Sequence, residues 1–96
     1  FGDGKYDLFC KIRNTGSIKK AASELCISYR KAWGDILEAE DGIGVKLVVR
    51  IRGGSEGGRS VLTEACERII AGYSKFRKSV DRNIRKSFNE FLKEIL

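Results

Sequence analysis

One periodic pattern constrains this chain more than any other: apolar residues recur at every third or fourth position through its last third. From Ile69 to Ile95 the steps between them are 4, 3, 4, 4, 4, 3 and 4 residues. The mean period of about 3.7 is that of an undistorted α-helix rather than of a heptad repeat. The helix that carries this stripe is expected to run from its cap at Thr63 to Leu96, and a helix of that span is roughly 50 Å long. A domain built from the rest of a 96-residue chain cannot cover a stripe of that length.

The stripe therefore predicts a C-terminal helix whose distal half needs a partner. We interpret residues 67–96 as a dimerisation element. Its expected contact residues are Tyr73, Phe76, Val80, Ile84, Phe88, Phe91 and Ile95. A break between Asp81 and Arg85, which would give two shorter helices, is the alternative.

Three shorter helices are expected in the first half of the chain. The spacing of apolar residues predicts helices over residues 5–14, 18–25 and 29–39. Ser17 and Ser28 stand where the second and third helices begin, and a serine hydroxyl is a favoured N-cap. Two short helices joined by so tight a turn indicate a helix-turn-helix.

A β-hairpin is expected over residues 45–62. Its first strand, 45–52, alternates apolar and basic residues, and 59–62 forms the second strand. One face of the first strand holds Leu47, Val49 and Ile51, and the other holds Lys46, Arg50 and Arg52. The glycine-rich segment 53–58 between the strands is expected to be a mobile turn.

This order of elements predicts a mainly α fold with a small β-hairpin, a winged helix-turn-helix followed by a long C-terminal helix. We divide the chain into a winged helix-turn-helix domain, residues 1–66, and the C-terminal helix, residues 67–96. The chain lacks Met at position 1, so we expect a processed or trimmed product with residues missing before Phe1.

The third predicted helix has the features of a recognition helix. Its expected core side holds Ala32, Ile36 and Ala39. Arg30, Gly34 and Leu37 lie roughly opposite, on the face that enters the major groove in such motifs. Arg30 can donate a bidentate pair to guanine, and Gly34 lets the helix backbone come close to DNA. Tyr29 and Trp33 flank the core side, where they either join this face or pack on the domain.

The formal charge of +6 is concentrated on two segments. Residues 17–33 and residues 46–60 each carry a net charge of +3, and an acidic stretch separates them. This pattern favours double-stranded DNA as the partner, because Lys and Arg side chains that bind its phosphates release the counterions condensed on the DNA. The expected DNA-binding residues are Ser17, Lys19, Lys20, Arg30, Lys31, Gly34 and, on the basic wing 50–59, Arg50, Arg52 and Arg59.

Several segments together resemble a known family. They are Gly16-Ser17-Ile18, Ala21-Ala22, Leu25, the run from Ser28 to Trp33, the run from Gly44 to Arg50, and the run from Leu62 to Ala65. As a set, over about residues 5–73, they resemble the N-terminal DNA-binding domain of the ModE-type molybdate-responsive regulators. That domain is itself similar to the LysR-type winged helix.

The resemblance implies a transcription regulator that binds operator DNA as a homodimer. It places base recognition at Ser28, Tyr29, Arg30 and Lys31, with the basic wing residues on the backbone or in the minor groove. The family also has a C-terminal molybdate-binding region, for which this chain has no room. We therefore expect neither molybdate binding nor any cofactor. Cys66 departs from the Gly that the family usually has after Thr-Glu-Ala.

Other functional classes have little support. The chain has no His, no paired-carboxylate motif and no nucleophile signature, so we do not expect an enzyme. Cys10, Cys26 and Cys66 sit at apolar positions and are expected to be buried, inert thiols rather than a metal or redox site. No apolar run is long enough to span a membrane, and a cytoplasmic protein is expected. A winged-helix module for protein assembly is the alternative function.

Overall fold

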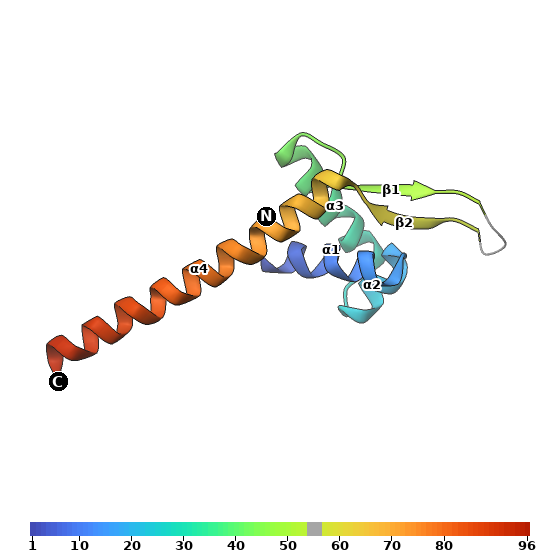
Figure 1. Ribbon diagram of the computed structural model, residues 1–96. Helices are drawn as coiled ribbons and strands as arrows, with labels where there is room; N and C mark the ends of the chain where they lie inside the picture. Colours follow the sequence, from blue (N-terminus) through green and yellow to red (C-terminus); the bar gives the residue numbers. More distant parts are fainter. Residues whose placement is uncertain (54–56) are drawn as a thin grey trace.

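The computed structural model describes residues 1–53 and 57–96 and confirms the predicted fold class. The elements, in chain order, are α1 (Asp3–Thr15), α2 (Ile18–Glu24), α3 (Tyr29–Ile43), β1 (Val48–Ile51), β2 (Arg59–Leu62) and α4 (Glu64–Ile95). Figure 1 shows α1, α2, α3 and the antiparallel hairpin gathered at one end, while α4 leaves them as a rod. The molecule is accordingly elongated, with principal extents of 64 × 26 × 22 Å.

A small apolar core joins the helices. The fully or nearly fully buried side chains are Leu8, Phe9 and Ile12 of α1, Ile18, Ala21 and Ala22 of α2, Ala32, Ile36 and Ala39 of α3, Leu47, and Cys66 and Ile70 of α4. The core side predicted for the third helix is therefore confirmed. Alanine side chains let α2 and α3 approach α1 closely, which leaves their outer faces free.

The third helix is longer than predicted. It continues through residues 40–43, beyond its predicted end at residue 39, and ends at Gly44. Gly44 adopts a left-handed backbone with φ 86°, and its N–H donates to the Glu40 carbonyl. The prediction was wrong because Gly42 is compatible with a helix, whereas the helix ends where a left-handed residue is needed.

The first strand is shorter than predicted, and its alternation is different. Leu47 is fully buried but precedes the strand, whereas Val49 and Ile51 are 41% and 45% exposed. Val48 and its register partner Leu62 pack against the core instead. Leu47 therefore does not share its burial with Val49 and Ile51, with which the alternation grouped it, because it lies before the strand begins. The predicted turn 53–58 includes residues 54–56, which lie outside the described residues.

The C-terminal helix is continuous over 32 residues. The alternative break between Asp81 and Arg85 is therefore excluded. The Thr63 side chain caps the helix by accepting the N–H of Cys66 at 3.2 Å. Only Cys66 and Ile70, in the first two turns, are buried.

The three cysteines occupy different environments. Cys66 is buried, and desolvation raises the pKa of its thiol to about 12, so the thiol stays protonated and inert. Cys10 is half-buried. The prediction of a buried thiol is wrong for Cys26, which is exposed in the turn between α2 and α3 with φ 57°. Within residues 1–53 and 57–96, no group of three metal-ligating side chains comes together, and no helix could cross a membrane.

Glu40 connects α3 to the hairpin. Its carboxylate, on a side chain only 11% exposed, accepts the N–H groups of Leu47 at 2.8 Å and Val48 at 3.3 Å. Lys46 Nζ lies 3.7 Å from the other carboxylate oxygen. The residue thus satisfies two backbone donors at the point where the chain enters β1.

Replacing Glu40 should destabilise the domain. Glu40→Ala leaves two partly buried N–H groups without an acceptor, which lowers the free energy of unfolding by about 1–3 kcal/mol. Glu40→Gln keeps an acceptor oxygen and should lose less. Urea denaturation measures both. Glu38→Ala is the control, since its exposed pair with Lys5 contributes little; equal losses for the Glu38 and Glu40 alanine variants would contradict this role.

Candidate nucleic-acid interface

Two serine caps shape the helix-turn-helix formed by α2 and α3. The Ser17 hydroxyl accepts the N–H of Lys20 at 3.1 Å, and the Ser28 hydroxyl accepts the N–H of Lys31 at 2.9 Å. Between the helices, the Ile27 N–H donates to the Ala22 carbonyl at 3.0 Å. Both serines predicted as site residues therefore cap a helix, Ser17 at the start of α2 and Ser28 at the start of α3.

The exposed surface of α3 is organised in three rows of residues spaced four apart. We call them the apolar row (Tyr29, Trp33 and Leu37), the middle row (Arg30 and Gly34) and the charged row (Lys31 and Asp35). The apolar row is 51%, 38% and 54% exposed, and the rings of Tyr29 and Trp33 meet edge to face with centroids 6.3 Å apart. The two aromatic residues thus lie on the open face instead of packing into the core.

The charged row is largely self-neutralised. Lys31 Nζ donates to the Asp35 carboxylate at 2.7 Å, and this hydrogen bond raises the pKa of Lys31. Glu38, one turn beyond Gly34, accepts from Lys5 Nζ at 3.0 Å. Of the basic residues predicted for this helix, Arg30 is thus exposed without an ion pair to another described residue, whereas Lys31 is already paired.

Gly34 has no packing reason to be a glycine. A Cβ built on it would meet no described atom within 4 Å outside its own helix backbone. Glycine in a helix interior costs about 1 kcal/mol relative to alanine. The open space above Gly34 is therefore a place where an external body can approach the helix backbone.

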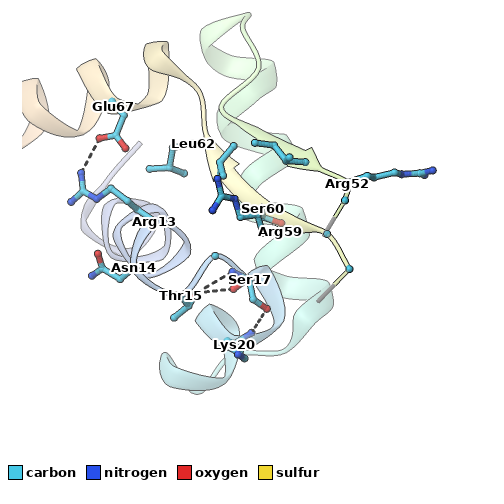
Figure 2. A pocket seen from close by; sticks show the side chains of 16 residues that line it. Arg13, Asn14, Thr15, Ser17, Lys20, Arg52, Arg59, Ser60, Leu62 and Glu67 are labelled. Carbon is cyan, nitrogen blue, oxygen red and sulfur yellow. Dashed lines mark hydrogen bonds and ion pairs between the residues drawn. The ribbon is translucent and has the colours of Figure 1, made fainter. Parts of the chain in front are cut away.

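A second basic surface lies between the α1–α2 turn and the hairpin. Figure 2 shows its lining, including Lys20 and Ser17 on one side and Arg59 on the other, with Arg52 extending away from the rest. The Ser60 N–H donates to the Gly16 carbonyl at 2.8 Å and ties β2 to the turn. The fold thus brings cations from two distant segments to one cleft.

Arg13 also lines this cleft, although the sequence did not single it out as a site residue. Its guanidinium donates to the Glu67 carboxylate at 2.9 Å, and this hydrogen bond raises the pKa of Arg13. The pair joins α1 to α4. Lys19 and Arg50 are exposed as well, on the helix-turn-helix and the hairpin respectively.

The sequence placed Leu37 on the DNA-facing side of the third helix and Trp33 beside it, but neither was named as a DNA-binding residue. The signal available in the sequence was that Trp33 and Leu37 follow Tyr29 at four-residue steps and lie outside the predicted core side of the helix. Sequence alone left two positions for the aromatic pair, and the structure decides between them.

The four-helix arrangement with its hairpin defines a winged helix-turn-helix domain. Residues 5–67 match the bacterial regulatory helix-turn-helix proteins of the lysR family. The chain belongs to this family, a class of regulatory proteins and not of enzymes.

Curated relatives have molybdenum-related names. The chain is 32% identical over 94 residues to the molybdenum-pterin-binding protein MopB of Rhodobacter capsulatus, covering 98% of this chain and 33% of MopB. It is 34% identical over 84 residues to the molybdenum transport protein ModE of Azotobacter vinelandii, covering 83% of this chain and 31% of that protein. The predicted resemblance to ModE is confirmed. The chain spans about a third of the length of these relatives.

Solved structures of similar fold include complexes with DNA. The CbnR_DBD–DNA complex superposes with a TM-score of 0.66 at 18% identity, covering 91% of this chain and 94% of that one. The complex of BenM_DBD with benA site 1 DNA gives a TM-score of 0.62 at 21% identity, covering 88% and 92%. At these identities the likeness establishes the fold.

Proposed function

We propose that this chain is the DNA-reading part of a homodimeric transcription regulator. In this proposal, the first turns of α3 enter the major groove, and the basic wing 50–59 lies on the backbone or in the minor groove. The support is the exposed face of α3, where Arg30 is unpaired among the described residues and Gly34 leaves the backbone open. The family membership and the DNA-bound solved structures of the same fold support the same partner.

The cleft of Figure 2 supports a contact with the DNA backbone. Lys20, Arg52 and Arg59 line it, and none of them has an ion pair to another described residue. Lys20 stands on α2, Arg59 on β2, and Arg52 directly follows β1. Three such cations beside a recognition helix suit neighbouring phosphates, which position the protein without reading sequence. Ser28, Tyr29 and Arg30 then stand at the start of α3, where base edges are contacted in helix-turn-helix proteins.

Arg30→Ala tests the base-reading role. If Arg30 donates a bidentate pair to guanine, affinity for a duplex selected from a random pool should fall by about 1–3 kcal/mol, with relaxed preference at one base pair. Fluorescence anisotropy at several salt concentrations measures this. Lys19→Ala is the control: it should weaken binding equally on all sequences and flatten the salt dependence.

Two outcomes would contradict the DNA proposal in different ways. Equal weakening on every sequence would show that Arg30 touches only phosphate. Wild-type binding that is weak and insensitive to salt would favour the assembly module, in which the basic faces are incidental.

We further propose that α4 forms the dimer. The last polar contact of the helix with α1 in the described chain is the ion pair of Arg77 with Asp3 at 3.6 Å, and the helix then leaves the domain. Its apolar stripe remains in water: Phe76, Ile84, Phe88, Phe91 and Ile95 are 53–61% exposed. An apolar surface of this extent marks an interaction site. A second copy presents the same stripe, and a two-fold pair of long helices is the simplest closed arrangement that covers both.

Truncation after Phe76 should give a monomer, because it removes the greater part of the stripe. Sedimentation should show the mass of a single truncated chain, with binding to a duplex holding two half-sites much weaker and binding to a single half-site retained. Ile84→Glu tests the same face in the full chain, and Lys86→Glu, on the opposite face, is its control. A truncated protein that still sediments with the mass of two chains would overturn the dimer proposal.

A further inference from the structure

The apolar row of α3 lies outside the apolar core formed by the described residues. Tyr29, Trp33 and Leu37 are exposed, and none of them belongs to the core of the described chain or to the side chains packed against it. A row of two aromatic side chains and a leucine on three successive helical turns is a continuous apolar surface. Such a surface, left open to water, indicates a contact with another molecule.

The middle row shows how closely that molecule can approach. Gly34 follows Trp33 directly and lies one turn after Arg30. Because no described atom fills the space above Gly34, a partner seated on Arg30 can reach the helix backbone there. It would then also touch the indole of Trp33 beside it. The apolar row is therefore continuous with the proposed DNA interface.

The charges on either side of the middle row indicate which side of α3 a bound duplex contacts. On the far side of the middle row lies the ion pair of Lys31 and Asp35 at 2.7 Å, and the middle row itself continues beyond Gly34 with Glu38, which is paired with Lys5 at 3.0 Å. The apolar row lies on the other side and carries no carboxylate, so it is the side of α3 on which a duplex meets no acidic group.

The chemistry of the major groove then indicates which base group the apolar row contacts. Among the base edges exposed there, the C5-methyl of thymine is the apolar group. We propose that the apolar row, Trp33 and Tyr29 foremost, contacts thymine methyl groups beside the base pair that Arg30 reads. This inference rests on the proposed function and adds a second reader to it: Arg30 selects guanine by hydrogen bonds, and the apolar row selects thymine by its methyl group.

Replacing thymine by deoxyuridine tests this directly, because it removes only the methyl group and keeps base pairing. Each thymine of a selected duplex is replaced in turn, and affinity is measured by fluorescence anisotropy. Wild-type protein should lose about threefold to tenfold at one or two positions in each half-site, as expected for losing one buried methyl contact. Trp33→Ala should bind more weakly and no longer distinguish thymine from uracil at those positions.

The controls separate this contact from folding defects. Ile43→Ala changes an apolar side chain of similar exposure, 42%, at the far end of α3 and should keep the wild-type response to uracil. Tyr29→Ala gives a second test of the row if Trp33→Ala fails to fold, as judged by thermal melting. The experiment on wild-type protein needs no variant at all.

The outcomes distinguish the inference from the function on which it rests. If wild-type protein binds the selected duplex with steep salt dependence but loses no affinity at any uracil, the DNA proposal stands and the thymine contact is wrong. The same conclusion holds if Trp33→Ala retains the full uracil effect, in which case the row is left for a protein partner. If no duplex is preferred over random DNA, the proposed function itself fails.

Discussion

The close packing of small side chains under α3 is the constraint on which the rest of the molecule depends. The helix is anchored by Ala32, Ile36 and Ala39, each no more than 5% exposed. Two of these three are alanines, so α3 sits close against the core while contributing little volume to it. As a result, the faces of the helix that turn away from the core are free to carry unburied side chains. The helix can carry three exposed rows because a narrow stripe of buried residues is enough to anchor it to the core.

Because the apolar core is small, the other elements are held in place by polar contacts. The hairpin has few core residues of its own, since Val49 and Ile51 are exposed. It is positioned instead by Glu40, which accepts two of its N–H groups, and by the hydrogen bond from Ser60 to Gly16. Arg13 and Glu67 connect α1 to α4 in the same way. These links set the basic cleft at a fixed position relative to α3.

The sequence was sufficient for features that depend on local periodicity. The 3.7-residue stripe predicts a C-terminal helix, Ser17 and Ser28 predict two helix starts, and the wheel of the third helix predicts its buried side. It was insufficient where a tertiary contact decides. Gly42 and Gly44 are the same residue type, yet only Gly44 ends the helix. The strand alternation was shifted because Leu47 is buried before the strand begins. Cys26 lies at an apolar position in the pattern but in an exposed turn in the fold.

For the candidate site, sequence identified the basic residues but not their pairing. Lys31 and Asp35 stand four residues apart on the predicted helix, a spacing that favours an ion pair, and the structure shows this pair formed while Arg30 has no such partner among the described residues. Likewise, the aromatic pair is compatible with a core or a surface until the helix is placed against its neighbours. The sequence does not show which exposed row of the helix faces a binding partner.

The effect of Gly34→Ala tests most directly the claim that the free face of α3 comes close to DNA. Alanine should raise the free energy of unfolding by about 0.5–1 kcal/mol, because the space around Gly34 is open and alanine favours the helix. It should lower affinity for the selected duplex about tenfold, since the added methyl crowds the approach. Gly42→Ala, at an equally open position in the last turn of α3, should stabilise the domain and leave affinity unchanged. A Gly34→Ala protein that is more stable and binds as tightly as wild type would contradict the account.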